Sequence, residues 1–190
     1  TTSAENLGEI LEGDRIENSP YEIRMLEDMT CKVVCKQTLT VEMRKQFQTM
    51  IQDEYLVNWI VDNLPAATKY ARTGKNQVTY VNGFPVGVQK GEKYYLHNHV
   101  RINLKYHTNP DKYFGYRIVG FEVEPFSMHQ AVKEKDGVLQ ASCQDGDAAP
   151  IFDLDAHDEL TFTYDVSWAH SEIRWASRFD NYLKMTGGPG

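Results

Sequence analysis

This chain of 190 residues has few cysteines, no long apolar run and no familiar catalytic motif. No stretch approaches the roughly 20 apolar residues of a membrane-spanning helix, and no apolar leader opens the sequence, so we expect any signal peptide to have been removed. The sequence lacks Gly-x-Ser-x-Gly, His-Glu-x-x-His, Walker-type and Gly-x-Gly-x-x-Gly segments. Hydrolase, zinc-protease and nucleotide-binding functions therefore have no support. Nor is there a usable Asn-x-Ser/Thr sequon, so we expect no N-glycosylation.

Basic residues are also scarce, since 20 Lys and Arg stand against 27 Asp and Glu, for a net charge of -7. Such a chain is a poor match for a nucleic-acid backbone, so we expect no nucleic-acid partner. The proportions of hydrophobic (41%) and charged (25%) residues are those of a globular protein. We predict a single domain over residues 1–185, with a polar N-terminal arm over residues 1–19 and a tail or linker over residues 186–190.

Hydrophobic periodicity predicts a mainly β fold with one helix. Apolar residues between Met43 and Tyr55 recur at helical spacing, and Thr40 suits an N-cap, so we predict one amphipathic helix over about residues 41–54. The longest strand is predicted over Lys93–His107, where Val100, Ile102 and Leu104 alternate with polar residues and are expected to face the core. Asn82-Gly83 predicts a two-residue hairpin turn between flanking strands. About eight short strands with a single helix favour an antiparallel β-sandwich.

The three cysteines, Cys31, Cys35 and Cys143, do not have the spacing of a zinc or thioredoxin-like motif. On a regular strand Cys31 and Cys35 would lie about 13 Å apart, too far for a mutual disulfide. The predicted bridge therefore joins one of them to Cys143. Cys35 is the preferred partner and Cys31 the alternative, while three reduced cysteines remain a further possibility.

Three other clusters are candidates for a metal or catalytic site. His97-Asn98-His99 places two imidazoles at strand spacing, but a zinc site needs further donors and no other histidine has a suitable position. The acidic run from Asp153 to Glu159 lacks the glycine and distal glutamate of an EF-hand loop, which favours a solvated turn. Glu122 and Glu124 fit the wet face of a strand better than a catalytic carboxylate pair. We therefore predict no catalytic, metal or cofactor site.

The C-terminal segment Ile173–Leu183 places Trp175, Phe179 and Tyr182 near helical spacing, with Arg174 and Arg178 beside them. Aromatic and basic side chains of this kind suit a membrane-water interface. Packing of the same aromatic residues onto the domain's own core is an equal alternative.

Several motifs together resemble the nonaspanin family, the transmembrane nine superfamily. They are spread over almost the whole sequence: Gly13–Tyr21, the Gly-Phe-Pro-Val-Gly run from Gly83, Arg117–Phe126, Leu160–Trp168 and Ser171–Met185. The resemblance implies a lumenal ectodomain whose residues 171–185 form a juxtamembrane segment leading into a membrane-spanning region. It implies a location on the lumenal side of Golgi or endosomal membranes, with the cell surface as a further location.

The resemblance also implies a non-enzymatic role in sorting and trafficking membrane proteins, with family roles in adhesion and phagocytosis. The expected partners are membrane-protein cargo and the membrane itself. A surface of Trp168, Arg174, Trp175, Arg178, Phe179 and Tyr182 is the predicted contact region. Two other hypotheses are a sandwich that binds sugar or lipid headgroups near Tyr94, Tyr95 and Tyr106, and a metal-dependent enzyme built on His97 and His99.

Overall fold

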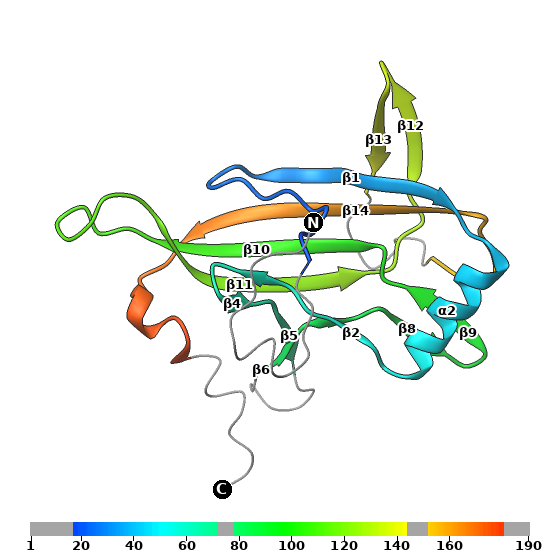
Figure 1. The fold of residues 1–190 in the computed structure, drawn as a ribbon, viewed down its shortest axis with the longest axis horizontal. Helices are drawn as coiled ribbons and strands as arrows, with labels where there is room; N and C mark the ends of the chain where they lie inside the picture. The colour runs from blue at the N-terminus through cyan, green and yellow to red at the C-terminus, as the bar shows by residue number, and fades with distance from the viewer. Residues whose placement is uncertain (1–16, 72–77, 144–151, 181–190) are drawn as a thin grey trace, which may run out of the picture.

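The computed structural model describes residues 17–71, 78–143 and 152–180, and shows a mainly β protein with one α-helix (Figure 1). This confirms the predicted fold class. The largest sheet has six strands, which in spatial order are β1 (Met29–Thr38), β14 (Glu159–His170), β10 (His99–His107), β11 (Arg117–Phe126), β5 (Ala67–Ala71) and β6 (Val78–Asn82). No helix in the described residues has the length and apolar character needed to cross a bilayer.

The six-stranded sheet is mixed rather than purely antiparallel. β1 with β14, β10 with β11, and β5 with β6 pair antiparallel, whereas β10 with β14 and β11 with β5 pair parallel. A parallel pair requires a long connection between its strands. Residues 108–158 supply that connection between β10 and β14, with β11 and a separate hairpin inside it.

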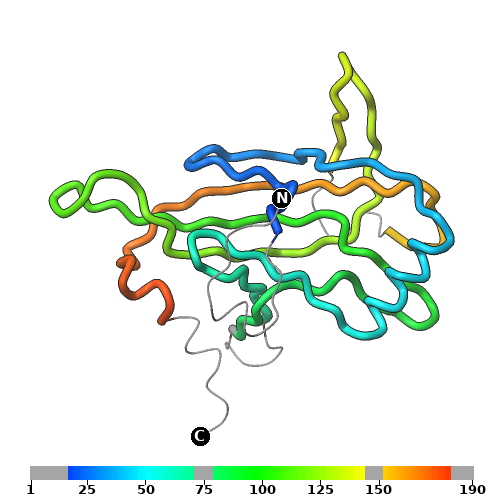
Figure 2. Tube along the Cα trace, in the orientation of Figure 1, coloured from blue at the N-terminus to red at the C-terminus, as the bar shows by residue number. Residues whose placement is uncertain are grey.

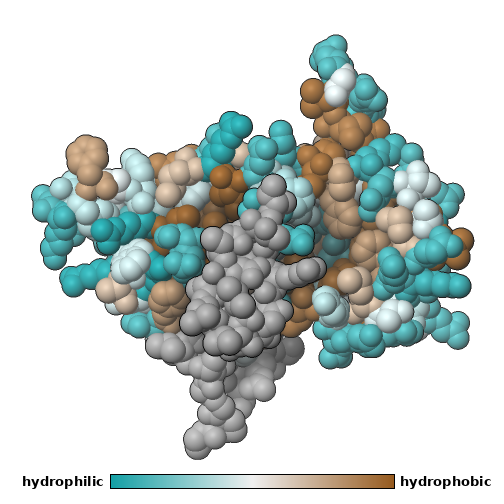
Figure 3. Space-filling model, viewed as in Figure 1, coloured by the Kyte–Doolittle hydropathy of each residue, from teal (hydrophilic) through white to brown (hydrophobic). Residues whose placement is uncertain are grey.

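Eight shorter strands form two-stranded sheets within the described residues. These pairs are β2 (Leu56–Val57) with β7 (Phe84–Pro85), β3 (Ile60–Val61) with β4 (Leu64–Pro65), β8 (Gly87–Lys90) with β9 (Lys93–Leu96), and β12 (Ala131–Lys135) with β13 (Val138–Ser142). The β12–β13 hairpin projects from the body of the protein (Figure 2), and hydrophobic residues gather at its base in the face shown in Figure 3.

The main core lies between the six-stranded sheet and the short strands packed on it. Val100, Ile102 and Leu104 of β10 are at most 2% exposed, which confirms the predicted alternation of this strand. They share a cluster with Leu64 of β4 and Phe84 of β7, so the two layers are arranged like a sandwich. Each such side chain contributes roughly 1.5–3 kcal/mol when fully buried.

The single helix, α2 (Val41–Gln52), confirms the predicted element and ends two residues earlier than expected. Thr40 is the N-cap, because its hydroxyl accepts a hydrogen bond from the Met43 backbone N–H at 3.2 Å. Glu54 has a positive φ of 53°, which is incompatible with another helical turn. Ile51 is buried in a second core cluster with Leu96 and neighbouring residues, where the apolar stripe of the helix packs.

The predicted strand Lys93–His107 is divided into β9 and β10 by His97 and Asn98. The Asn98 side chain is 1% exposed and donates to the carbonyls of Met128 (2.8 Å) and Thr161 (3.1 Å). Its own carbonyl oxygen accepts from the Met128 backbone N–H at 2.8 Å. This buried amide therefore satisfies backbone groups at a point where a regular ladder stops.

The predicted hairpin around Asn82-Gly83 is wrong, because β6 pairs with β5 and β7 pairs with β2. A two-residue hairpin turn of the Asn-Gly type needs positive φ at both residues. Here Gly83 has a φ of +74° whereas Asn82 is not among the residues with positive φ. The Gly83 N–H donates to the Ala66 carbonyl at 2.8 Å, so the chain passes from one layer to the other.

Candidate functional site

The C-terminal segment lies against the end of the six-stranded sheet at which β10 and β14 both finish (Figure 1). The Ser171 N–H donates to the Tyr106 carbonyl at 2.8 Å, and the Ser171 carbonyl lies 2.8 Å from Nδ1 of His107. A 3₁₀ helix, η1 (Trp175–Ser177), follows. The segment is therefore held to the sheet before its aromatic residues begin.

Arg178 is the centre of an aromatic cluster in this segment. Its guanidinium carbon lies 4.0 Å from the ring centroid of Trp175 and 4.9 Å from that of Phe179, and Nη2 donates to the Asp62 carbonyl at 3.3 Å. A guanidinium over an aromatic face is attracted by the ring quadrupole. Nε and Nη1 have no hydrogen-bond partner in the described part of the chain. Arg178 is only 4% exposed. It therefore contacts the rings of Trp175 and Phe179 from the buried side of the segment.

The remaining residues of the predicted contact surface divide between surface and interior. Arg174 is exposed, as are Trp175 (43%) and Phe179 (39%). Trp168 is half-buried and packs against the main core, where its Nε1 has no partner among the described residues. Tyr182 lies outside the described residues. The structure thus brings Trp175, Arg178 and Phe179 together and leaves the exposed Arg174 beside them.

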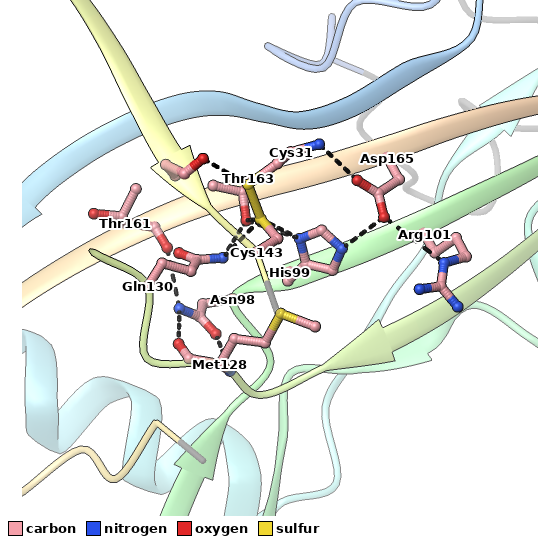
Figure 4. The surroundings of a disulfide bond; sticks show 11 residues. Cys31, Asn98, His99, Arg101, Met128, Gln130, Cys143, Thr161, Thr163 and Asp165 are labelled. Carbon is pink, nitrogen blue, oxygen red and sulfur yellow. Dashed lines mark hydrogen bonds and ion pairs between the residues drawn. A yellow bond between two sulfur atoms is a disulfide. The ribbon is translucent and has the colours of Figure 1, made fainter. Parts of the chain in front are cut away.

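A disulfide joins Cys31 of β1 to Cys143, with the two Cα atoms 5.6 Å apart (Figure 4). The preference for Cys35 is therefore wrong, and the alternative partner is correct. β1 shifts register between Met29 and Lys32 and again between Val33 and Cys35, and Cys31 has a φ of +51°. These irregularities interrupt the regular strand that was assumed for Cys31 and Cys35. Cys35 remains an exposed free thiol, and burial raises its pKa.

A buried polar network surrounds this disulfide (Figure 4). His99 is fully buried, with Nδ1 2.8 Å from the Thr163 hydroxyl and 3.6 Å from Sγ of Cys143. Its Nε2 lies 3.3 Å from Oδ2 of Asp165, whose other carboxylate oxygen accepts from the Cys31 backbone N–H at 2.7 Å. The network fixes the bridge between β1 and the end of the β12–β13 hairpin.

Asp165 is ionised within this network. Burial alone raises its carboxyl pKa, but hydrogen bonds from His99 and the Cys31 N–H, together with the charge of Arg101, outweigh burial and lower the pKa. Sequence reasoning missed Asp165 and Thr163. The only available signal was the alternation of β14, which places both on the strand face opposite the apolar residues Tyr164 and Val166.

His97 and His99 have separate surroundings. His97 directs Nδ1 to the Pro85 carbonyl at 2.8 Å, and its burial lowers the imidazole pKa. His99 is bonded to Thr163 and Asp165 instead. Among the described residues, no group of three or more His, Cys, Asp or Glu side chains is placed to hold a metal ion. The geometry therefore gives the metal-enzyme hypothesis no supporting observation.

Five of the six carboxylates considered as calcium or catalytic groups have a separate cationic partner, and the sixth, Asp155, accepts from Nε2 of Gln48 at 3.3 Å. The pairs are Asp153 with Lys93 (2.9 Å), Asp158 with Arg44 (2.7 Å), Glu159 with Lys36 (2.9 Å), Glu122 with Lys105 (2.6 Å) and Glu124 with Arg101 (3.6 Å). The hydrogen bond from Lys93 lowers the pKa of Asp153 despite an opposing effect of desolvation. These carboxylates tie strands, loops and α2 together, and do not converge on a common point.

The three tyrosines of the ligand-binding hypothesis do not come together either. Tyr94 and Tyr95 lie on β9, where the Tyr94 hydroxyl contacts Gln52 of α2. Tyr106 lies near the far end of β10 and packs edge-on against Tyr116 and His170. A separate cavity of about 70 Å³ is lined by Lys36, Asn98, His129, Gln130, Val132, Phe152, Glu159 and Thr161. Ligand pockets are commonly about 300–1,000 Å³, so this cavity is small for a sugar or lipid headgroup.

Comparison with known proteins gives consistent matches over nearly the full sequence. The family profile described as endomembrane protein 70 matches residues 1–189. Transmembrane 9 superfamily member 10 of Arabidopsis thaliana is 40% identical over 198 residues, which cover 96% of this chain and 31% of that protein. Human transmembrane 9 superfamily member 4 is 36% identical over 205 residues, covering 98% of this chain and 32% of the relative.

The chain thus spans about a third of the length of the curated relatives that it matches. The names of these relatives describe a membrane-protein superfamily and no enzymatic activity. No solved structure matches the chain.

Proposed function

The chain belongs to the endomembrane protein 70 family, the transmembrane 9 superfamily, and from this premise we propose that it is the lumenal domain of a polytopic Golgi or endosomal membrane protein. In this proposal, the domain has no catalytic activity and contributes to sorting and trafficking of other membrane proteins. The membrane-spanning part lies in the two thirds of the relatives' length that this chain does not cover.

The observation that carries the proposal is the aromatic and arginine cluster of residues 174–179. Arg178 is buried between Trp175 and Phe179, while parts of both rings and Arg174 face outward. Aromatic rings with an apolar body and a polar edge, combined with basic side chains, are typical of the boundary between membrane and water. A domain with this cluster beside its membrane anchor is suited to contact membrane proteins close to the bilayer.

The buried position of Arg178 determines how the surface is tested. Neutralising Arg178 would disturb the packing of two rings, whereas Arg174→Gln changes an exposed cation at the same place. Lys133→Gln is the matched control, because Lys133 is an exposed cation on the β12–β13 hairpin, away from this segment (Figure 1). All variants are made in the full-length protein, expressed in cells and crosslinked before purification. Mass spectrometry then compares the membrane proteins captured by each.

We expect the capture of Golgi or endosomal membrane proteins to fall with Arg174→Gln and to persist with Lys133→Gln. Equal capture by the wild-type protein and both variants would show that recognition lies elsewhere. Capture no greater than that of an unrelated membrane-anchored ectodomain would overturn the sorting function itself.

A further inference from the structure

The loop between β10 and β11, residues 108–116, carries the most exposed large hydrophobic side chain in the described structure. Phe114 has a relative exposure of 107%, which means that no neighbouring atom shields the ring. The end of the molecule where this loop lies is mostly hydrophilic in the face shown in Figure 3. A single exposed apolar residue is ordinary on a protein surface. A functional role for Phe114 therefore has to be argued from the residues around it.

The loop is an organised structure that holds Phe114 outward. The backbone N–H groups of Lys112 and Tyr113 both donate to the Asn109 carbonyl at 3.0 Å, and the Thr108 hydroxyl donates to the Gly115 carbonyl at 3.1 Å. Gly115 has a φ of +101°, a conformation that other residues rarely adopt. These bonds close the base of the loop and form a turn at its tip, and Phe114 stands fully exposed between the two.

The base of this loop is joined to the C-terminal segment by an unbroken series of ring contacts. The Arg117 guanidinium lies 4.1 Å from the ring centroid of Tyr113 and 5.5 Å from that of Trp175. Tyr106 contacts both Tyr116 and His170 at ring distances of 5.5 and 5.6 Å. Both ribbon views place the loop and η1 at the same end of the sheet (Figures 1 and 2).

We propose that the tip of the β10–β11 loop inserts Phe114 into the interface of the lipid bilayer. This inference rests on the proposed membrane-anchored setting, which brings this end of the domain toward the membrane. Phe114 then reaches the apolar boundary, while Tyr113, Tyr116 and Arg117 occupy the headgroup level, where such side chains are favoured.

The shape of the loop favours lipid over a protein partner. A stable protein interface buries about 800 Å² on each side with close shape complementarity, and a narrow tip with one apolar ring offers far less. A bilayer requires no complementary shape, so one ring on a projecting loop is sufficient for shallow insertion. Asp111 offsets the charge of Lys112, so the loop itself is neutral, and Arg117 at the start of β11 is the nearest remaining cation. Insertion is therefore expected to depend on the ring more than on anionic lipid.

The test uses a fluorophore that reports its surroundings at the tip of the loop. The full-length protein carries Cys35→Ser, which removes the exposed free thiol, and Lys112→Cys labelled with an environment-sensitive dye, so that Phe114 itself stays in place beside the label. It is reconstituted in phosphatidylcholine vesicles with or without lipids bearing a nitroxide quencher. Val138, 58% exposed near the tip of the distant β12–β13 hairpin, is the matched position, labelled after Val138→Cys.

Quenching of the dye at position 112, with none at position 138, is the expected result, and Phe114→Ser should reduce the quenching at position 112. A dye at position 112 that stays in water and is not quenched would overturn the inference, as would equal quenching at both positions. A parallel measurement uses the unlabelled 190-residue chain and its Phe114→Ser variant with plain phosphatidylcholine vesicles. Loss of the ring is expected to weaken vesicle binding about tenfold, and unchanged binding would contradict insertion.

The purified lipid system contains no cargo protein, so its result is independent of the sorting function. Failure of insertion with intact cargo capture would overturn only the role of Phe114. Insertion without cargo capture would leave this inference standing and remove the proposed function.

Discussion

The disulfide between Cys31 and Cys143 is expected to be a major contributor to the stability of this domain. It joins residues 112 positions apart and ties the β12–β13 hairpin to the edge strand β1. An isolated two-stranded hairpin is marginally stable in water. The perturbation that tests the bridge is the double variant Cys31→Ser and Cys143→Ser, which removes the covalent link and leaves two small polar side chains.

The expected size of the effect follows from the length of the loop that the bridge closes. For a closed loop of 112 residues, the loss of chain entropy in the unfolded state corresponds to about 4–5 kcal/mol in the free energy of unfolding. This is an upper figure, because unfolded chains retain some structure and measured values are often smaller. Domains of this size are stable by about 5–15 kcal/mol in total, so loss of the bridge is expected to remove a large fraction of the free energy of unfolding.

Guanidinium denaturation followed by tryptophan fluorescence measures this free energy for the wild-type and variant chains. Cys35→Ser is the matched control, since Cys35 is exposed and forms no disulfide, and its effect should remain within about 0.5 kcal/mol. Peptide mapping without reductant should recover the Cys31 and Cys143 peptides as one species. The reasoning fails if the double variant loses less than about 1 kcal/mol, or if Cys35→Ser is equally destabilising.

Two further predictions concern the backbone turn between the layers and the buried network. Gly83→Ala should destabilise the fold by more than the roughly 1–2 kcal/mol of a left-handed residue, because an added Cβ would lie 2.7 Å from the Val57 carbonyl oxygen. Gly91 is also at positive φ but has open space around the added atom. In the same denaturation assay, Gly91→Ala should therefore lower the free energy of unfolding only by the roughly 1–2 kcal/mol of a left-handed residue. Folding lowers the pKa of Asp165 below 3.8, so its ionised form stabilises the fold above that pH and the contribution disappears as the pH falls through the lower folded pKa. Denaturation of Asp165→Asn and wild-type chains should therefore differ at neutral pH and converge in acid, and a constant difference would contradict the assignment.

Local sequence signals predicted those elements whose structure depends on neighbouring residues. The helix from Val41 follows from a cap at Thr40 and from apolar residues at a spacing that one helical face satisfies. The alternation of Val100, Ile102 and Leu104 identified the buried face of β10 for the same reason. Neither signal carries information about which strands pair.

Features that depend on distant contacts were not predictable in this way. Asn82-Gly83 is a good hairpin signal, yet Ala66 supplies the carbonyl that fixes Gly83 in a passage between layers. The cysteine pairing was misassigned because spacing alone allowed a bridge from Cys143 to either Cys31 or Cys35, and the two register shifts in β1 around these cysteines have no visible signal in the sequence. Within the C-terminal segment, Arg178 was expected among the contact residues, but its burial depends on Asp62, more than 100 residues earlier.

The parallel pairing of β10 with β14 determines which segments meet at one end of the six-stranded sheet. Because the two strands run in the same direction, with Tyr106 opposite His170, the segments that follow them emerge side by side. An antiparallel pair would have placed the β10–β11 loop and the C-terminal segment at opposite ends of the sheet. The parallel arrangement instead brings Phe114 to the same end as Trp175, through Arg117. The direction of one strand pair, which no alternation of residues reveals, therefore creates the surface on which both the sorting proposal and the lipid-insertion proposal depend.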